Sequence, residues 1–528
     1  MSCINSLAQR NWVVFCAFWV LAVVFLSCVS PTLGVFWQDN TLNADINIYH
    51  VLGRGWTQGY IPYRDLWDVK GPGQFLQYAL ASLISSGNLS GMLVIHSATL
   101  ACSLFCVFRL ASLYLRPAPA VFATVCMVLC ACEFSGHPSE TVLAFQLIVW
   151  YLFLKRLRLL SSLFVCGICM GVSLSIKFNL AAFLGPLAVG MVFSCGPDMR
   201  AFWRRIGVLL GGVAAVVVPF LLYFLWHGAL YDLWDGYVLT AVSYATTSSR
   251  PSALASIDLG FIAKFMPNYG MLASFVPAGI LSGGAICLLL GGMVVCSVRP
   301  RVYGLSVMMI ACLWSSLILS IYAVFGGYYA FSHYYYTFYP FIALTLVCMV
   351  KWLASRNIVW LKRAGVWLVF AGMLVVSLLS CMTYLYNNEA KKRGETLTAV
   401  RAVREAFNPA GQSPPSVLIL PNALVGFYRL SPLPPPHRNF IMQLTPQGER
   451  AWVEMCGELM ESKRTDLVVC PLDVSGQPAF LSDELAARLL ANYTLQAAYP
   501  VSPPYIYRRL GVFKKKSCSD SMENVSSS

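Results

Sequence analysis

Long apolar runs recur along the first 385 residues of this 528-residue chain. Trp12 to Val29, Ile206 to Trp226 and Val366 to Leu379 each approach or reach the roughly 20 residues that cross a bilayer as a helix. Because lipid offers the backbone no hydrogen-bond partner, such runs are expected to be helical. A single run would suit the buried core helix of a soluble protein, but a chain full of them indicates an α-helical polytopic membrane protein.

The lengths of the apolar runs predict about eleven transmembrane helices. They are expected near residues 12–31, 90–114, 117–132, 139–154, 160–176, 179–195, 206–227, 269–296, 302–325, 335–352 and 364–385. The first is interpreted as a retained anchor, because its apolar run is longer than that of a usual signal peptide and no clear cleavage site follows it.

Lysine and arginine in the short loops predict the orientation. With the N-terminus in the cytoplasm, fifteen basic residues fall on the inner side and six on the outer side. This asymmetry places the first long loop, residues 35–89, outside the cytoplasm. It also accounts for much of the net charge of +14, so that charge is no sign of nucleic-acid binding.

Composition changes after residue 385. Residues 387–528 hold sixteen of the 37 Lys and Arg and thirteen of the 23 Asp and Glu. Strands are predicted at Ser416 to Leu420 and Asp466 to Cys470, and a helix at Leu481 to Asn492 opened by Ser482. We therefore expect a transmembrane catalytic domain at 1–385, a small extracytoplasmic α/β domain at 386–516 and a disordered tail at 517–528.

Nineteen cysteines are present, and most fall within the apolar runs, where they are expected to pack as small apolar residues. Cys456 and Cys470 lie in the C-terminal domain instead. The sequence leaves open whether these two pair.

The first long loop concentrates ionisable groups in a chain that has only 11% charged residues, against about 25% in soluble proteins. Asn47 to Trp56 and Gln74 to Ile84 are predicted as short interfacial helices, with Asp45 opening the first. Turns are expected at 61–65 and 71–73. The charges in between are Arg64, Asp65, Asp68 and Lys70. Such a loop holds carboxylates and cations at the outer membrane surface, which points to function.

The run D-x-x-x-Y…G…P-Y-R-D-L-W-D-x-K-G-P in this loop resembles the first extracytoplasmic loop of GT-C glycosyltransferases. More narrowly, it is similar to the bacterial relatives of protein O-mannosyltransferases and to the lipid A aminoarabinose transferase. Supporting segments follow at 138–140, 171–178 and 332–340. Two departures stand out: the usual acidic pair is Asp45-Ile46 here, and the usual K-P-P is Lys70-Gly71-Pro72.

The resemblance implies transfer of a sugar from a polyprenyl phosphate carrier to a glycolipid, polysaccharide or protein acceptor. This takes place at the outer face of a bacterial inner membrane, as in lipopolysaccharide modification. Asp45 is then the catalytic base, and Lys70, with Arg64 or Lys177, binds the phosphate. Tyr335 or a neighbouring tyrosine donates a hydrogen bond to it. The full predicted substrate-binding set is Arg64, Asp65, Asp68, Lys70, Glu140, Lys177, His333 and Tyr335. No cofactor or metal is predicted, since no His/Asp cluster has clear ligand spacing.

Each of these residues also has a structural alternative. Asp45 suits a helix cap, and Glu140 a solvated first-turn acid. Asp65 and Asp68 suit salt bridges with Arg64 and Lys70, and Lys177 suits an interfacial lysine that extends to water. His333 and the tyrosines that follow it suit an aromatic belt.

Two other classes of function compete with a transferase. A transporter would account for the number of spans, but the sequence shows no two-fold internal similarity, and its ionisable residues gather at one face. An assembly protein would use the C-terminal domain to bind partners. A transferase requires Asp45, Lys70 and Lys177 to lie around one outward-facing site.

Overall fold

The computed structural model of the chain describes residues 2–30, 44–130, 136–155, 160–193, 198–246, 278–325, 332–355, 403–408, 413–420, 422–438, 440–441, 446–462, 464–479, 481–500 and 509–516. The helices of the first half are α1 (Ser2–Val29), α2 (Ala44–Thr57), α3 (Pro72–Ile84), α4 (Ser90–Ala111), α5 (Pro117–Cys130), α6 (Pro138–Leu154), α7 (Leu160–Ile176), α8 (Asn179–Ala182), α9 (Gly185–Phe193), α10 (Met199–Trp226), α11 (Leu230–Leu233), η2 (Trp234–Leu239) and α12 (Thr240–Thr246). Those of the second half are α15 (Ala278–Val298), α16 (Pro300–Tyr303), α17 (Val307–Phe325), η4 (Ser332–Phe338), α18 (Tyr339–Ser355), η6 (Asn422–Leu430), α21 (Pro446–Glu461) and α22 (Asp483–Asn492). The strands are β1 (Val417–Ile419), β2 (Leu467–Leu472), β3 (Tyr493–Pro500) and β4 (Arg509–Lys515).

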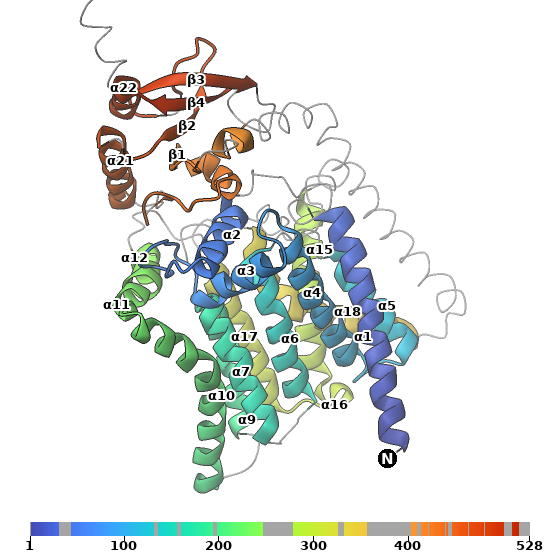
Figure 1. Ribbon diagram of the computed structural model, residues 1–528. Helices are drawn as coiled ribbons and strands as arrows, with labels where there is room; N and C mark the ends of the chain where they lie inside the picture. Colours follow the sequence, from blue (N-terminus) through green and yellow to red (C-terminus); the bar gives the residue numbers. More distant parts are fainter. Residues whose placement is uncertain are drawn as a thin grey trace, which may run out of the picture.

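The helices form where the long apolar runs predict them. The predicted span at 179–195 is divided between α8 and α9, and the one at 302–325 consists of α16 followed by α17. The predicted span at 364–385 lies outside the described residues, so the number of about eleven stays a prediction. Figure 1 shows the N-terminus at one end of the helical bundle and α2, α3 and the sheet at the other.

Helix α10 shows what surrounds the bundle. Among the described residues, α4 and α10 are long and apolar enough to cross a membrane, alongside several shorter apolar helices. The most apolar 18-residue window of α10 has a mean hydropathy of 2.5, yet only 11% of it is buried inside the protein. Leu210, Leu222 and Leu225 are exposed along it. An apolar face of this size is costly in water, so α10 faces lipid and the chain is embedded in a membrane.

Glycines bring α7 and α10 together. A Cβ atom on Gly167 would lie under 3.0 Å from the Leu209 carbonyl oxygen, and one on Gly212 would meet the Phe164 carbonyl oxygen equally closely. Small residues of this kind let membrane helices pack backbone to backbone, because lipid gives apolar side chains little reason to associate. The contact holds α7 in place, and Lys177 follows directly after the end of α7.

The first loop folds as predicted into two short helices. Asp45 lies in the first turn of α2, and Gly71 precedes α3. The two helices pack against each other at the end of the bundle that also carries the sheet (Figure 1).

The C-terminal sheet has the strand order β1-β2-β4-β3, with β1 and β2 parallel and the other pairs antiparallel. The strands predicted at 416–420 and 466–470 are confirmed as β1 and β2. Helix α22 is confirmed as well, and the Ser482 hydroxyl accepts a hydrogen bond from the Leu485 N–H at 3.3 Å as its cap. Cys456 and Cys470 are free buried thiols.

Both faces of this sheet are buried. Leu418 and Val468 pack with α21 and α22, while Val417 and Val469 belong to one hydrophobic cluster with residues of the first loop such as Leu52. Burial on two faces explains why β1 and β2 are continuous apolar runs rather than alternating ones. It also means that the predicted division at residue 385 separates segments that share a core.

A buried arginine adds a polar contact to this shared core. The Arg54 guanidinium, on the last turn of α2, donates to the Arg429 carbonyl at 3.0 Å and to the Tyr428 carbonyl at 3.3 Å. Arg429, in η6, donates from Nε to the Asn47 side-chain oxygen at 2.9 Å. Burial lowers the pKa of Arg54 to about 10, so its charge persists at neutral pH. Hydrogen bonds thus connect helix α2 to η6 in the C-terminal segment.

Replacing Arg54 with Leu should lower the apparent Tm of the purified protein, because two buried carbonyls lose their donor at about 1–3 kcal/mol each. Intrinsic-fluorescence melting in detergent measures this. The control is Arg488→Leu, which removes surface ion pairs to Glu461 and Glu484 that are each worth about 0–1 kcal/mol. Equal shifts in the two variants would contradict the role assigned to Arg54.

Candidate functional site

The proposed base, Asp45, lies at the N-terminal end of α2 and remains accessible to solvent. Its side chain is 42% exposed, and the Tyr49 hydroxyl donates to its Oδ2 at 3.3 Å. The Nδ1 of His137 lies 3.9 Å from the same oxygen. Burial lowers the pKa of His137 to about 4, with Asp45 acting in the opposite direction and Lys70 and Lys177 in the same one. The imidazole is therefore neutral near pH 7, and the Asp45 carboxylate stands beside a neutral histidine.

Two lysines from distant parts of the sequence face this acid. Burial lowers the pKa of Lys177, and the nearby charge of Lys70 lowers it further, whereas Asp45 and Asp68 raise it. The Lys177 Nζ is buried and makes no hydrogen bond within the described part of the chain. It lies 3.4 Å from the centre of the Tyr334 ring, and Lys70 lies 5.6 Å from that of Tyr49. Two lysines gathered in this way can bind an anion, whose charge favours their protonated forms.

A close backbone contact brings the two lysines together. The Gly71 N–H donates to the Ile176 carbonyl at 2.9 Å, which joins the residue after Lys70 to the residue before Lys177. A Cβ atom at Gly71 would lie under 3.0 Å from the Ser175 carbonyl oxygen. Only glycine fits between the loop and the end of α7. The K-G-P departure from the usual K-P-P therefore has a physical reason in this chain, since a proline there would also lack the donated N–H.

Tyr63 contacts Lys70 from within the same loop. Its backbone adopts a φ of 68°, which side chains other than glycine seldom take. Its N–H donates to the Leu66 carbonyl at 2.7 Å and its hydroxyl to the Lys70 carbonyl at 2.6 Å. These two hydrogen bonds hold the strained turn. The backbone next to Lys70 is therefore held by Tyr63 within the loop and by the contact of Gly71 with the end of α7.

Asp68 belongs to this cluster but is buried. Burial raises its pKa, and the neighbouring charges of Lys70, Asp45 and Lys177 also act on it. Its Oδ1 accepts a hydrogen bond from the Val69 N–H at 2.6 Å. A buried acid fits the role of balancing the two lysines better than that of meeting an incoming substrate.

Glu140 lies beneath the site in a buried network. Its Oε2 accepts from the Gly136 N–H at 2.8 Å and lies 3.6 Å from His96 Nδ1, with both side chains fully buried. The Gly136 carbonyl accepts in turn from the Tyr78 hydroxyl at 2.9 Å. Glu140 therefore shapes the short segment that carries His137 to Asp45, rather than lining the open part of the site.

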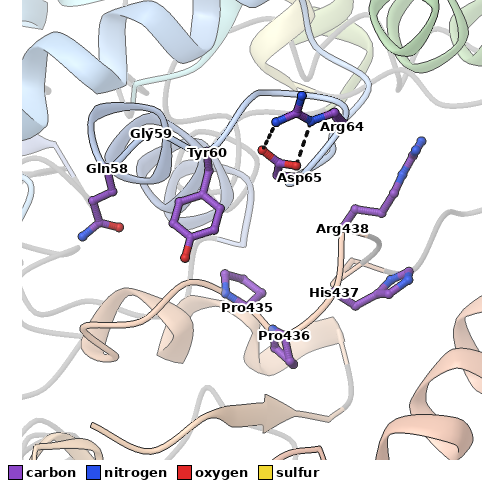
Figure 2. A pocket seen from close by; sticks show the side chains of 9 residues that line it. All are labelled: Gln58, Gly59, Tyr60, Arg64, Asp65, Pro435, Pro436, His437 and Arg438. Atoms are coloured by element: carbon purple, nitrogen blue, oxygen red, sulfur yellow. Dashed lines mark hydrogen bonds and ion pairs between the residues drawn. The ribbon is translucent and has the colours of Figure 1, made fainter. Parts of the chain in front are cut away.

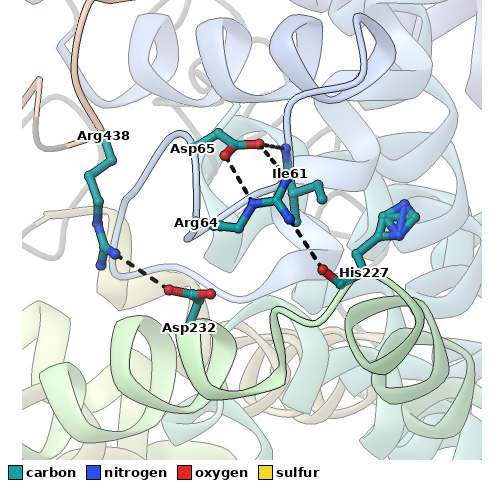
Figure 3. A network of polar contacts seen from close by, with 6 residues as sticks. All are labelled: Ile61, Arg64, Asp65, His227, Asp232 and Arg438. Atoms are coloured by element: carbon teal, nitrogen blue, oxygen red, sulfur yellow. Dashed lines mark hydrogen bonds and ion pairs between the residues drawn. The ribbon is translucent and has the colours of Figure 1, made fainter.

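The remaining predicted residues lie elsewhere. Arg64 and Asp65 pair with each other at 3.0 Å on the far side of the strained turn, and Arg64 donates to the His227 carbonyl at 3.2 Å (Figure 3). Tyr335 packs in the hydrophobic core of the bundle, so Tyr334 is the tyrosine that meets Lys177. His333 lies in η4, and its side chain is outside the described part of the structure.

Two residues that lie beside Asp45 were not predicted as site residues: His137, and Tyr49, which is the tyrosine of the D-x-x-x-Y motif. Tyr49 had a signal, because it follows Asp45 by four residues and so shares its face of α2. His137 precedes the Pro138 that opens α6, and nothing in its spacing pointed to Asp45. Among the described residues, no group of three or more His, Cys, Asp or Glu is arranged to hold a metal ion.

No family model and no curated protein matches the sequence. Solved structures do match it. ArnT from Cupriavidus metallidurans bound to undecaprenyl phosphate has a TM-score of 0.60 at 13% identity, over 95% of this chain and 98% of that one. In the apo state, ArnT gives a TM-score of 0.58 at 14% identity, over 96% and 98%. An oligosaccharyltransferase of Archaeoglobus fulgidus gives 0.47 at 12% identity, over 87% and 69%.

The chain has the fold of the GT-C glycosyltransferases. The resemblance seen in the first loop is thereby confirmed at the level of the fold, over nearly the full length of both chains. ArnT is the lipid A aminoarabinose transferase, one of the two kinds of enzyme that the loop motif resembles.

Replacing Gly71 with Ala should disturb the lysine cluster without unfolding the bundle, because the added methyl group pushes Lys70 away from Lys177. We expect inorganic phosphate, used as a probe anion, to bind at least about tenfold more weakly, as a lost charged contact would cause. Binding to the purified protein measures this. Gly87→Ala is the control, since a Cβ atom there meets nothing within 4 Å. Unchanged binding in Gly71→Ala would show that the close contact does not position the lysine.

Proposed function

We propose that the protein is a membrane glycosyltransferase that takes a sugar from a polyprenyl phosphate donor at the extracytoplasmic face. The gathering of Asp45, Lys70 and Lys177 at one end of the bundle carries this proposal. Its support is the fold shared with ArnT, of which one structure is bound to undecaprenyl phosphate. The inner membrane of a bacterium, with the N-terminus in the cytoplasm, is the location that fits.

The residues divide the chemistry between them. Lys70 and Lys177 bind the phosphate of the donor and stabilise the negative charge that grows on it as the sugar leaves. The Asp45 carboxylate accepts the proton of the acceptor hydroxyl as its oxygen bonds to the anomeric carbon. The bond between that carbon and the phosphate oxygen breaks, its electron pair stays on the phosphate, and the configuration at the sugar carbon inverts.

The position of the cluster favours this function over transport. Asp45 and Lys70 belong to the first loop and Lys177 to the end of α7, all on one side of the bundle. A transporter binds its cargo near the middle of the membrane between helix repeats. A site at the mouth of the bundle suits a carrier lipid whose tail stays in the bilayer.

Replacing Asp45 with Asn should abolish transfer while the protein still accumulates in the membrane, because the amide cannot accept the proton. Mass spectrometry of envelope glycolipids from a deletion strain carrying each variant measures this, with immunoblotting for the protein. Asp483→Asn, an exposed acid in the first turn of α22, is the matched control. Transfer at the wild-type level by Asp45→Asn would remove Asp45 from the role of base.

Replacing Lys177 with Met should weaken undecaprenyl phosphate binding about 10- to 100-fold, as expected for a lost charged hydrogen bond. It should also change the pH dependence. Since the pKa of Lys177 is lowered in the free protein, phosphate binding takes up a proton there, and its contribution to affinity falls as pH rises.

Affinity measured for both proteins from pH 6 to 9 tests this. The ratio of wild-type to Lys177→Met affinity should shrink as pH rises. Because the phosphate ionises in the same way in both measurements, its own ionisation cancels in the ratio. Lys351→Met is the control, because Lys351 also lies over a tyrosine, 4.6 Å from the ring centre of Tyr303, but away from the site. A ratio that does not change with pH would contradict the proton uptake.

A further inference from the structure

A cavity lies next to the strained turn, and neither Lys70 nor Lys177 is among the residues that line it. It has a volume of about 610 Å³ and lies between the first loop and the C-terminal segment (Figure 2). Its lining comprises Gln58, Gly59, Tyr60, Arg64, Asp65 and residues 435–438. We propose that this cavity is a glycan-binding subsite that holds a remote part of the acceptor. That the bound glycan is the acceptor rests on the proposed function, whereas the binding of a glycan does not.

The walls of the cavity are tied together. The backbone N–H of Trp67 donates to the Arg438 carbonyl at 3.1 Å. The Arg438 guanidinium contacts Asp232 at 3.4 Å (Figure 3). Arg64 reaches the His227 carbonyl at 3.2 Å. Three segments far apart in the sequence therefore fix the shape of the cavity, which is the condition for a preformed binding site.

The side chains in the cavity suit a molecule rich in hydroxyl groups. Asp65 accepts hydrogen bonds, Arg64 donates them and Gln58 does both, which matches sugar hydroxyls that donate and accept at once. Figure 2 shows the Tyr60 ring directed from the loop toward Pro435 and Pro436, and Tyr60 is 36% exposed. An exposed ring beside prolines offers an apolar surface on which the C–H face of a sugar can rest.

The charge in the cavity argues against a second phosphate site. Arg64 is already paired with Asp65, and Arg438 with Asp232. The pKa of His437 is lowered by burial and by Arg438, so this histidine adds no charge at neutral pH. Both cations thus form an ion pair with an acid, whereas the Lys177 Nζ makes no hydrogen bond within the described part of the chain. The neutral cavity selects an uncharged glycan and leaves the phosphate to the lysines.

The distance between the two sites defines what part of the substrate the cavity holds. Asp45 lies in the first turn of α2 and Gln58 directly follows its end. At 1.5 Å per residue, the helix separates them by roughly 20 Å. The reacting hydroxyl must be at Asp45, so the cavity binds sugar residues several units away. The acceptor is therefore an extended oligosaccharide or a glycolipid with a large headgroup, and remote contacts of this kind contribute to its selection.

Binding of a glycan to the purified full-length protein tests the proposal. The probe is the oligosaccharide released by mild acid from the envelope glycolipids of a deletion strain, observed by saturation-transfer NMR. We expect Tyr60→Ala to weaken binding about tenfold and Gln58→Ala to weaken it in the same direction. Tyr231→Ala, an exposed tyrosine outside the lining, should bind as the wild type does.

Two further arms separate this inference from the proposed function. Asp45→Asn should bind the oligosaccharide normally even though it transfers nothing, and inorganic phosphate should not displace the glycan. The inference fails if the wild type shows no binding, if Tyr60→Ala and Gln58→Ala both bind like the wild type, or if phosphate competes. If Asp45→Asn loses transfer while neither the wild type nor any variant binds the oligosaccharide, the proposed function stands and the glycan-binding proposal fails.

Discussion

The hydrogen bond from Gly71 to the Ile176 carbonyl is the contact on which the site depends. It joins the residue after Lys70 to the residue before Lys177, so that the charge of Lys70 lowers the pKa of Lys177. Glycine makes the approach possible, and the glycine contacts between α7 and α10 keep the receiving helix in place. A bound phosphate relieves the repulsion that the backbone imposes. The backbone contact therefore sets the positions of the two lysines without a ligand, and phosphate binding at the proposed site would require little rearrangement.

Helix α2 links the site to the rest of the protein at both of its ends. Its first turn carries Asp45, and its last turn carries the buried Arg54 that donates to carbonyls of η6. The sheet contributes one of its two buried faces to the same cluster. Loosening of the C-terminal segment would thus be transmitted to the helix that carries Asp45, the proposed base. The C-terminal domain is part of the scaffold of the site, beyond any role in contacting an acceptor.

Local patterns made much of the fold predictable. The short helices of the first loop follow from their apolar spacing, and β1 and β2 follow from continuous apolar runs that two buried faces require. Ser482 caps α22 as such residues usually do. The spacing of the lysines in the sequence could not reveal their meeting, because a long-range backbone contact creates it.

The places of the other predicted residues depend on tertiary contacts. Arg64 lies six residues before Lys70, next to the turn at Tyr63, and it contacts Asp65 and the His227 carbonyl. Tyr335 or a neighbouring tyrosine was expected near the phosphate; Tyr335 lies in the hydrophobic core, and its neighbour Tyr334 lies against Lys177. His137 reaches Asp45 because the buried Glu140 holds the preceding residue, Gly136. Each outcome depends on a tertiary contact that no local pattern encodes.

A difference in how the charges are paired would let one small loop serve the two proposed ligands. Within the described part of the chain, the Lys177 Nζ makes no hydrogen bond and can still donate to a phosphate. In the cavity, Arg64 pairs with Asp65 and Arg438 pairs with Asp232, so less of their positive potential reaches a ligand. A phosphate carrier and a neutral glycan thus find different partners about one helix length apart. Because α2 fixes this spacing, a short acceptor that reached Asp45 would leave the cavity empty and lose the contacts made there.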